Sequence, residues 1–276
     1  MLNLEDDNLQ LLLKFLQSRN VAHSLKQCPS STTIKVGVKT YHFSVGEKIS
    51  AAHLNFIKKT KKELCHNAEK LGRFEDKERP AYIGFTPTFE GDFSFDHGQY
   101  VELDIVGAYW KTAFDFGLIS EDTYKHGNEV PKGVRLMALG SAASVKEEMR
   151  FDGEKYIFVG IEKNDHGRNA FFRISKHIDN LLKECLQVVS SEGAFFWVDA
   201  VFIRRKWKDF IIETLNGKGY QIKEIDIYQI SGNIEKSFIE VISIKSKHEK
   251  SKLFCFEIKK YFKNGKKTIK KTSKKP

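Results

Sequence analysis

Two aspartates are the residues of this sequence whose type and setting could support chemistry. Asp104 stands in Leu103-Asp-Ile-Val-Gly-Ala-Tyr-Trp, and Asp199 stands in Phe195-Phe-Trp-Val-Asp-Ala-Val-Phe-Ile; each is the only charge in its run. A buried carboxylate is costly unless it is neutralised, hydrogen-bonded or bound to a metal ion. Two such carboxylates on neighbouring strands would form a Mg²⁺ or Mn²⁺ site suited to phosphoryl transfer. The alternative is that each aspartate caps a helix or opens a turn.

The segments around these aspartates predict strands and one long helix. Alternating and apolar residues predict strands over 81–86 and 99–106, the second of which contains Asp104. An apolar stripe at helical spacing predicts a helix over 170–190, which leads directly into the Asp199 run. Further strands are expected at 220–230, 237–244 and 253–258. Hairpin-joined strands with a few helices predict an α+β fold, in which helices pack on one face of an antiparallel sheet.

The first 80 residues predict a separate, small α/β region. Leucine spacing predicts a helix over 8–17, alternation predicts a strand pair or a bulged strand over 33–45, and a second helix is expected over 50–71. The lysine run 58–62 lies in this second helix and would form either its solvated face or a face that contacts phosphates. A charged stretch then sets the boundary, so we expect domains at 1–80 and 81–258.

The positive charge is concentrated at the end of the chain. The 276 residues have a net charge of +10, but Lys259 to Pro276 contains nine lysines and no acid, which leaves +1 for the other 258 residues. Such a block cannot bury enough apolar surface to fold, so we expect 259–276 to be a basic flexible tail. The tail would either bind a polyanion, most simply nucleic acid, or keep the protein in solution.

Composition excludes several classes of protein. The chain is 41% hydrophobic and its four cysteines lie far apart, so a disulfide framework and a zinc ribbon are not indicated. The acidic start and the lack of a long apolar run predict a soluble protein without a membrane partner, located in the cytoplasm or, for a phage protein, in the virion.

Four motifs, taken in order, resemble the palm domain of family B DNA polymerases. Asp104-Ile-Val-Gly-Ala-Tyr109 is similar to the family's first motif, and Lys132 with Gly140 keeps the spacing of the second. The Asp199 run is similar to the third motif, an acidic hairpin in which Asp199 takes the place of the second Asp. Lys259-Lys260-Tyr261 resembles a segment that contacts the primer–template duplex.

The resemblance implies a role for each matching residue. Asp104 and Asp199 would hold Mg²⁺ or Mn²⁺ and would be the catalytic residues. Tyr109 would stack under the sugar of an incoming nucleotide, and Lys132 would meet its triphosphate. The structural alternatives are a core aromatic for Tyr109 and an exposed lysine at a helix start for Lys132. Lys259, Lys260 and Tyr261 would bind nucleic acid, with DNA the expected partner.

Departures from the family pattern restrict what the resemblance implies. Trp197 stands where the third motif has its first Asp, Trp110 replaces a usual Pro, and Leu136 replaces an expected Asn. Only 27 residues separate Asp104 from Lys132, too few for long helical fingers. The matching region, about 81–261, therefore indicates the fold better than the activity.

Three functions follow as hypotheses. The first is a minimal, Mg²⁺-dependent nucleotidyltransferase that acts on DNA and nucleoside triphosphates. The second is a catalytically silent palm that binds nucleic acid or serves as a scaffold, as in an accessory protein of a phage or mobile element. The third is a metal-dependent nuclease, for which no histidine or lysine is specifically placed.

Overall fold

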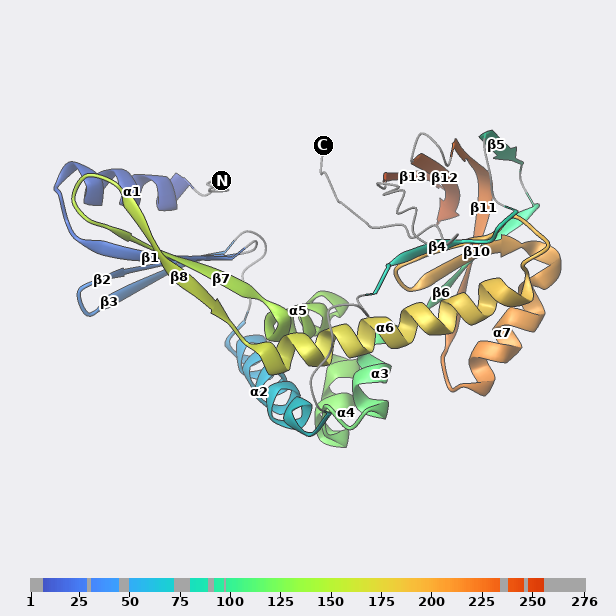
Figure 1. The fold of residues 1–276 in the computed structure, drawn as a ribbon, viewed down its shortest axis with the longest axis horizontal. Coiled ribbons are helices and arrows are strands. Elements are labelled where there is room, and N and C mark those ends of the chain that lie inside the picture. Colours follow the sequence, from blue (N-terminus) through green and yellow to red (C-terminus); the bar gives the residue numbers. More distant parts are fainter. Residues whose placement is uncertain are drawn as a thin grey trace, which may run out of the picture. The chain divides into compact units, whose positions relative to one another are not determined.

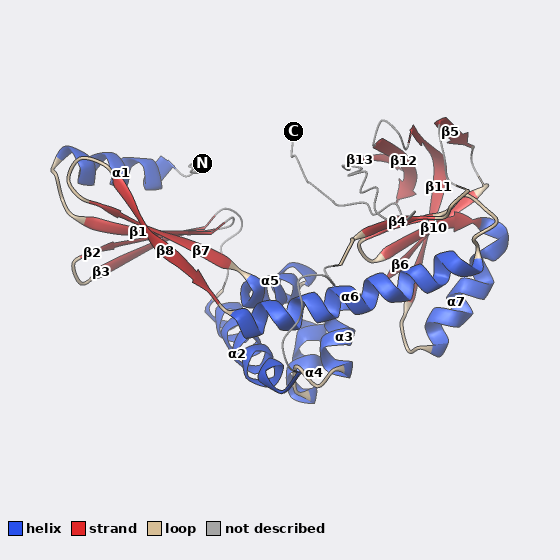
Figure 2. Ribbon diagram, viewed as in Figure 1, coloured by secondary structure: helices blue, strands red, loops and turns tan. Residues whose placement is uncertain are grey.

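The chain forms two compact units, each built from two separate stretches of sequence. The computed structural model describes residues 7–28, 31–44, 50–71, 80–88, 92–96, 98–233, 238–245 and 248–255. The first unit combines Met1–Arg73 with Gly117–Phe171, and the second combines Phe74–Phe116 with Phe172–Pro276. Helices and antiparallel sheets make up the described part of both units (Figures 1 and 2), which confirms the expected α+β fold.

The first unit contains a five-stranded antiparallel sheet in the order β3-β2-β1-β7-β8. Its elements are α1 (Asp7–Ser18), β1 (His23–Cys28), β2 (Ser31–Val36), β3 (Lys39–Ser44), α2 (Ala51–Ala68), α4 (Glu121–Glu129), α5 (Lys132–Ala143), β7 (Val145–Phe151) and β8 (Tyr156–Lys163). Leucines of α1 pack with Leu25 and Ile34 of the sheet to form a small core. Gly37, at φ +57°, makes the tight turn between β2 and β3, so the expected strand pair is a hairpin.

Strands β7 and β8 explain why the units are not continuous in sequence. Strand β7 pairs with β1 along its length, so residues 145–163 complete the sheet that the N-terminal residues begin. The division therefore differs from the expected domains 1–80 and 81–258, because 117–171 belongs with the N-terminal region. The expected tail, 259–276, lies outside the described residues.

The second unit is built on a larger antiparallel sheet in the order β13-β12-β11-β6-β10-β9-β4, with β5 paired to β11. Its elements are β4 (Ile83–Phe85), β5 (Asp92–Phe95), β6 (Tyr100–Ile105), α3 (Ala108–Asp115), most of α6 (Asp165–Val188), β9 (Phe195–Trp197), β10 (Ala200–Arg204), α7 (Lys208–Gly217), β11 (Ile222–Asn233), β12 (Phe238–Lys245) and β13 (His248–Cys255). Helices α6 and α7 lie on the same side of β4, β6 and β10 (Figure 1), as expected for helices on one face of the sheet.

The sheet is curved, and its face away from α6 and α7 encloses an apolar core. Tyr100 of β6 packs there with Phe195, Phe202 and apolar residues of β11 and β12. Glu102, two residues further along β6, is only 3% exposed and accepts hydrogen bonds from Lys252 Nζ at 2.8 and 3.2 Å. Strand β13, which carries Lys252, is three places away from β6 in the sheet order, so this bond requires strong curvature.

Two predicted boundaries differ from the observed ones. Helix α6 begins at Asp165, earlier than the expected residue 170, because the Asn164 side chain accepts a hydrogen bond from the Gly167 N–H at 2.8 Å and caps the helix. The last strand begins at His248 rather than at residue 253.

Candidate active site

Asp104 lies near the end of the central strand β6. It is directly opposite Ala200 of β10 on one side and Lys223 of β11 on the other. Its side chain is partly exposed, whereas Leu103 and Ile105 on either side of it are buried. Alternation along the strand therefore places Asp104 away from the helix-covered face, at an end that solvent can reach.

Asp199 lies in a turn and not within a strand. Val198 and Asp199 form the two-residue connection between β9 and β10, since Trp197 and Ala200 pair directly. This agrees with the alternative in which the aspartate opens a turn. The Asp199 carbonyl accepts a hydrogen bond from the Ile105 N–H at 3.0 Å. The structure thus brings the two predicted metal ligands to neighbouring backbone positions, because Asp104 precedes Ile105 and faces the residue after Asp199.

The turn that carries Asp199 is backbone-strained. Val198 has φ +60°, in the left-handed region that β-branched residues rarely adopt. Its N–H donates to the Tyr82 carbonyl at 2.9 Å, and Tyr82 is itself at φ +59°. Each such residue costs about 1–3 kcal/mol and persists only where surrounding structure imposes it. Strain of this kind is often found at functional sites, which makes this turn a candidate for one.

Tyr109 is a buried residue of the same region. It lies at the start of α3 and is 9% exposed. Burial is the main cause that raises the pKa of its phenol, nearby Tyr82, Asp199 and Asp179 raise it further, and a hydrogen bond with Ser175 lowers it. The pKa of the Tyr82 phenol is raised by burial in the same way. Tyr109 thus occupies a buried polar cluster beside Asp199, and its contact with a nucleotide sugar stays a prediction.

Asp179 of α6 belongs to this cluster and was not predicted from the sequence. Its side chain is 1% exposed and accepts hydrogen bonds from the Ala81 N–H at 2.5 Å and the Tyr82 N–H at 3.0 Å. The sequence did contain a sign that Asp179 is buried, because this acid follows Ile178 in the apolar part of α6. An acid in that position is buried when the helix packs, and it then requires partners.

The remaining predicted residues are not joined to this site. Lys132 is exposed at the first residue of α5, in the first unit, so its contact with a triphosphate stays a prediction. Lys259, Lys260 and Tyr261 lie outside the described residues.

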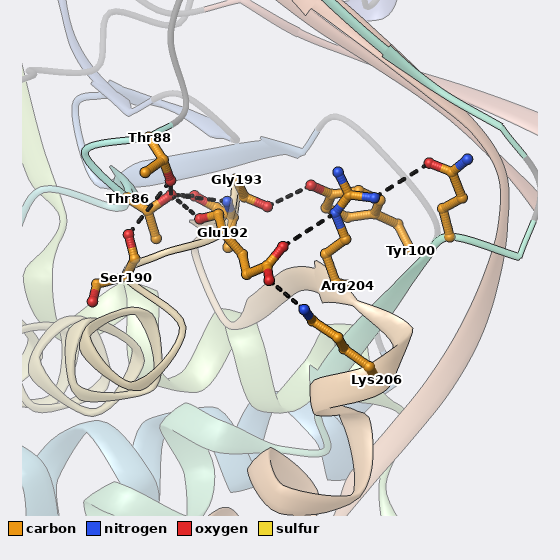
Figure 3. A network of polar contacts seen from close by, with 10 residues as sticks. Thr86, Thr88, Tyr100, Ser190, Glu192, Gly193, Arg204 and Lys206 are labelled. Carbon is orange, nitrogen blue, oxygen red and sulfur yellow. Dashed lines mark hydrogen bonds and ion pairs between the residues drawn. The ribbon is translucent and has the colours of Figure 1, made fainter.

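The open end of the β9–β10 hairpin is held by a separate polar network (Figure 3). The Thr86 hydroxyl donates to the Glu192 carbonyl at 2.7 Å, and the Tyr100 hydroxyl donates to the Gly193 carbonyl at 2.5 Å. The Glu192 carboxylate pairs with Arg204 at 3.6 Å and with Lys206. Burial raises the pKa of Tyr100 to about 12. The hairpin is therefore fixed at both ends, by this network and by the Tyr82–Val198 hydrogen bond at its turn.

The structure brings the backbones of Asp104 and Asp199 together, and the binding of Mg²⁺ by their carboxylates stays a prediction. Within the described ranges, no group of three or more His, Cys, Asp or Glu side chains could hold a metal ion. Mg²⁺ is usually bound by one or two carboxylates together with water and substrate phosphates. Zn²⁺ in a structural site requires four protein ligands. Two carboxylates alone would therefore suit Mg²⁺ or Mn²⁺ rather than a structural Zn²⁺, if their side chains share an ion as predicted.

Comparisons with protein-family models, with curated proteins and with solved structures gave no match to this chain. Among the helices that the structure describes, none combines the length and the apolarity needed for a bilayer span.

Proposed function

We propose that the second unit is a palm-like nucleotidyltransferase module in which Asp104 and Asp199 bind Mg²⁺. The observation that carries the proposal is the register of β6 and β10, which places two partly exposed aspartates at adjacent backbone positions. The strained turn at Val198 supports it, because such strain accompanies functional sites. The order of the sequence motifs and the antiparallel sheet are also consistent with a palm.

In this proposal the chain's main contributions are charge and position. Bound Mg²⁺ would neutralise phosphate charge and align the reacting oxygens for in-line transfer. Within the second unit, Asp104 and Asp199 would hold the ions at the end of β6, and Tyr109 would contact the sugar of the nucleotide. Because phosphoryl transfer depends mostly on positioning and electrostatics, short fingers would weaken nucleotide selection before they abolished the reaction.

One observation favours a catalytically silent palm as the second candidate. Trp197 occupies the position of the first Asp of the third motif, and it packs against the core of the curled sheet. A palm that retained only part of its acidic hairpin could bind nucleic acid without catalysing transfer. The same module would then serve as a scaffold for a phage or mobile element.

Metal binding and nucleotide incorporation by the wild-type protein separate these two candidates. We expect Mn²⁺ binding, followed by electron paramagnetic resonance, and extension of a primed DNA template by nucleoside triphosphates with Mg²⁺ or Mn²⁺. The double variant Asp104→Asn/Asp199→Asn is the blank for both measurements. DNA binding without Mn²⁺ binding or extension would support the silent palm. Cleavage of the template without extension would indicate a nuclease.

Helix α2 is the described surface on which we expect nucleic acid to bind. Lys58 and Lys62 are exposed one turn apart, opposite the buried residues Phe56, Thr60, Leu64 and Ala68. The only acid of α2, Glu63, accepts hydrogen bonds from Ser120 and Thr123 and forms an ion pair with Lys59 at 3.9 Å. Lys58 and Lys62 repel each other and slightly destabilise the helix when nothing is bound. Phosphate groups of a nucleic acid could bind both lysines and remove this repulsion.

Reversing this charge should therefore weaken DNA binding and its dependence on salt. For Lys58→Glu/Lys62→Glu we expect the slope of log K against log salt on duplex DNA to become shallower by about 2, since each lost phosphate contact removes about 0.9. Fluorescence anisotropy at several salt concentrations measures the slope. Lys35→Glu/Lys39→Glu, an equal charge change at exposed sites of β2 and β3, is the control. Equal slopes in the two variants would exclude α2 as the contact surface.

A further inference from the structure

We infer that Asp179 is a positioning residue that holds Asp199 in place through the backbone of Tyr82 and Val198. The inference rests on the proposed function, because it concerns how the proposed metal site is built. All four residues belong to the second unit, and the connection joins helix α6 to strand β4 and then to the β9–β10 turn.

The first step of the connection is a pair of charge-assisted hydrogen bonds. Each Asp179 carboxylate oxygen accepts one backbone N–H, from Ala81 at 2.5 Å and from Tyr82 at 3.0 Å. The side chain is 1% exposed, so water does not compete effectively for these bonds. Hydrogen bonds to a carboxylate are about twice as strong as those between neutral groups. Asp179 therefore fixes the backbone that leads into β4.

The second step passes from Tyr82 to the turn. The Tyr82 carbonyl accepts the Val198 N–H at 2.9 Å, and the ladder continues where Ile83 pairs with Trp197. Tyr82 and Val198 are at φ +59° and +60°, so two strained residues meet at this hydrogen bond. Neither conformation is favourable for its side chain, and both require an external restraint. Asp179 supplies that restraint for Tyr82, and Tyr82 supplies it for Val198.

The third step is the position of Asp199 immediately after Val198. The Asp199 carbonyl is held by the Ile105 N–H at 3.0 Å, and the preceding residue is held by Tyr82. The backbone on both sides of the proposed ligand is thus fixed, by β6 on one side and by Asp179 through Tyr82 on the other. An acid with a structural role alone would need no connection to Asp199. Here the hydrogen bonds that begin at Asp179 pass through Tyr82 and end at Val198, the residue before Asp199.

The test measures Mn²⁺ affinity and folding separately. Asn at position 179 has one acceptor oxygen, so Asp179→Asn retains one of the two N–H bonds and loses the charge. We expect its Mn²⁺ dissociation constant, from electron paramagnetic resonance, to rise about tenfold, in the range found for groups that orient metal ligands. Glu184→Gln removes the same charge from an exposed site of α6 and should change the constant by less than about twofold.

A second variant keeps the inference testable if Asp179→Asn does not fold. Glycine adopts φ +60° without strain, so Val198→Gly should fold at least as well as wild type but hold Asp199 less firmly. We expect weaker Mn²⁺ binding with an unchanged or higher melting temperature. Unchanged Mn²⁺ affinity in every folded variant would overturn the positioning role and leave the proposed function intact. Absence of Mn²⁺ binding by the wild-type protein would overturn both.

Discussion

Asp199→Asn is expected to lower Mg²⁺-dependent nucleotide incorporation by at least about a thousandfold. Asparagine keeps the size of the side chain but removes one of the two charges proposed to bind the ion. A metal ion contributes several kcal/mol to the transition state of phosphoryl transfer, and a loss of about 4 kcal/mol corresponds to about a thousandfold in rate. The loss should be similar for Asp104→Asn, because the proposed function gives both aspartates the role of metal ligand.

Asp209→Asn is the matched control for this prediction. Asp209 carries the same side chain on α7, where it is 94% exposed and only 3.7 Å from Lys208 Nζ. Its replacement should leave incorporation unchanged. The rate is measured by primer extension under single-turnover conditions, with tryptophan fluorescence as a check of folding. Activity that persisted in both Asp104→Asn and Asp199→Asn would exclude this pair as the catalytic site.

Lys252→Met is expected to destabilise the second unit by about 2–3 kcal/mol. The substitution leaves the Glu102 carboxylate, which is 3% exposed, without its partner at 2.8 Å. Removing one partner of a fully buried pair costs about 3–5 kcal/mol, and the 37% exposure of Lys252 reduces that cost. The double variant Glu102→Gln/Lys252→Met should be less destabilised than Lys252→Met, because it no longer buries an unpaired charge.

Tryptophan fluorescence during urea unfolding measures this effect on the correct unit. The three tryptophans of the chain, Trp110, Trp197 and Trp207, all belong to the second unit. Lys218→Met is the control, since Lys218 pairs with Glu184 on the exposed surface of the same unit, and its loss should cost at most about 1 kcal/mol. An equal midpoint for wild type and Lys252→Met would show that the buried pair does not hold the curled sheet.

Local patterns in the sequence were sufficient to predict many of the elements. The leucine spacing that predicts α1 and the apolar stripe that predicts α6 depend on neighbours within a few residues, and both helices are confirmed. Of the two arrangements expected around Gly37, the strand pair is the one observed. Strands β7 and β8 were missed because their signal is not local. The run Val145-Lys-Glu-Glu-Met-Arg-Phe has little alternation, and it forms a strand because β1 lies beside it.

The candidate site shows the same division between local and non-local information. Asp104 and Asp199 were recognisable as isolated charges in apolar runs. Their expected place on neighbouring segments agrees with the pairing of β6 with β10, which sets Asp104 opposite Ala200. The roles of Tyr82 and Asp179 could not be predicted, because they depend on backbone groups brought together by packing. No spacing rule relates residue 82 to residue 198. Only the pairing of β4 with β9 makes them neighbours.

The chain crosses between the two units three times, after Arg73, Phe116 and Phe171. During synthesis on the ribosome, strand β6 therefore emerges almost a hundred residues before β10, the strand that pairs beside it. Before β10 emerges, β7 and β8 can complete the sheet of the first unit. We therefore expect the first unit to fold first and the second unit to fold last. No single cut yields either unit intact, and an isolated version of the second would need 117–171 replaced by a short artificial linker.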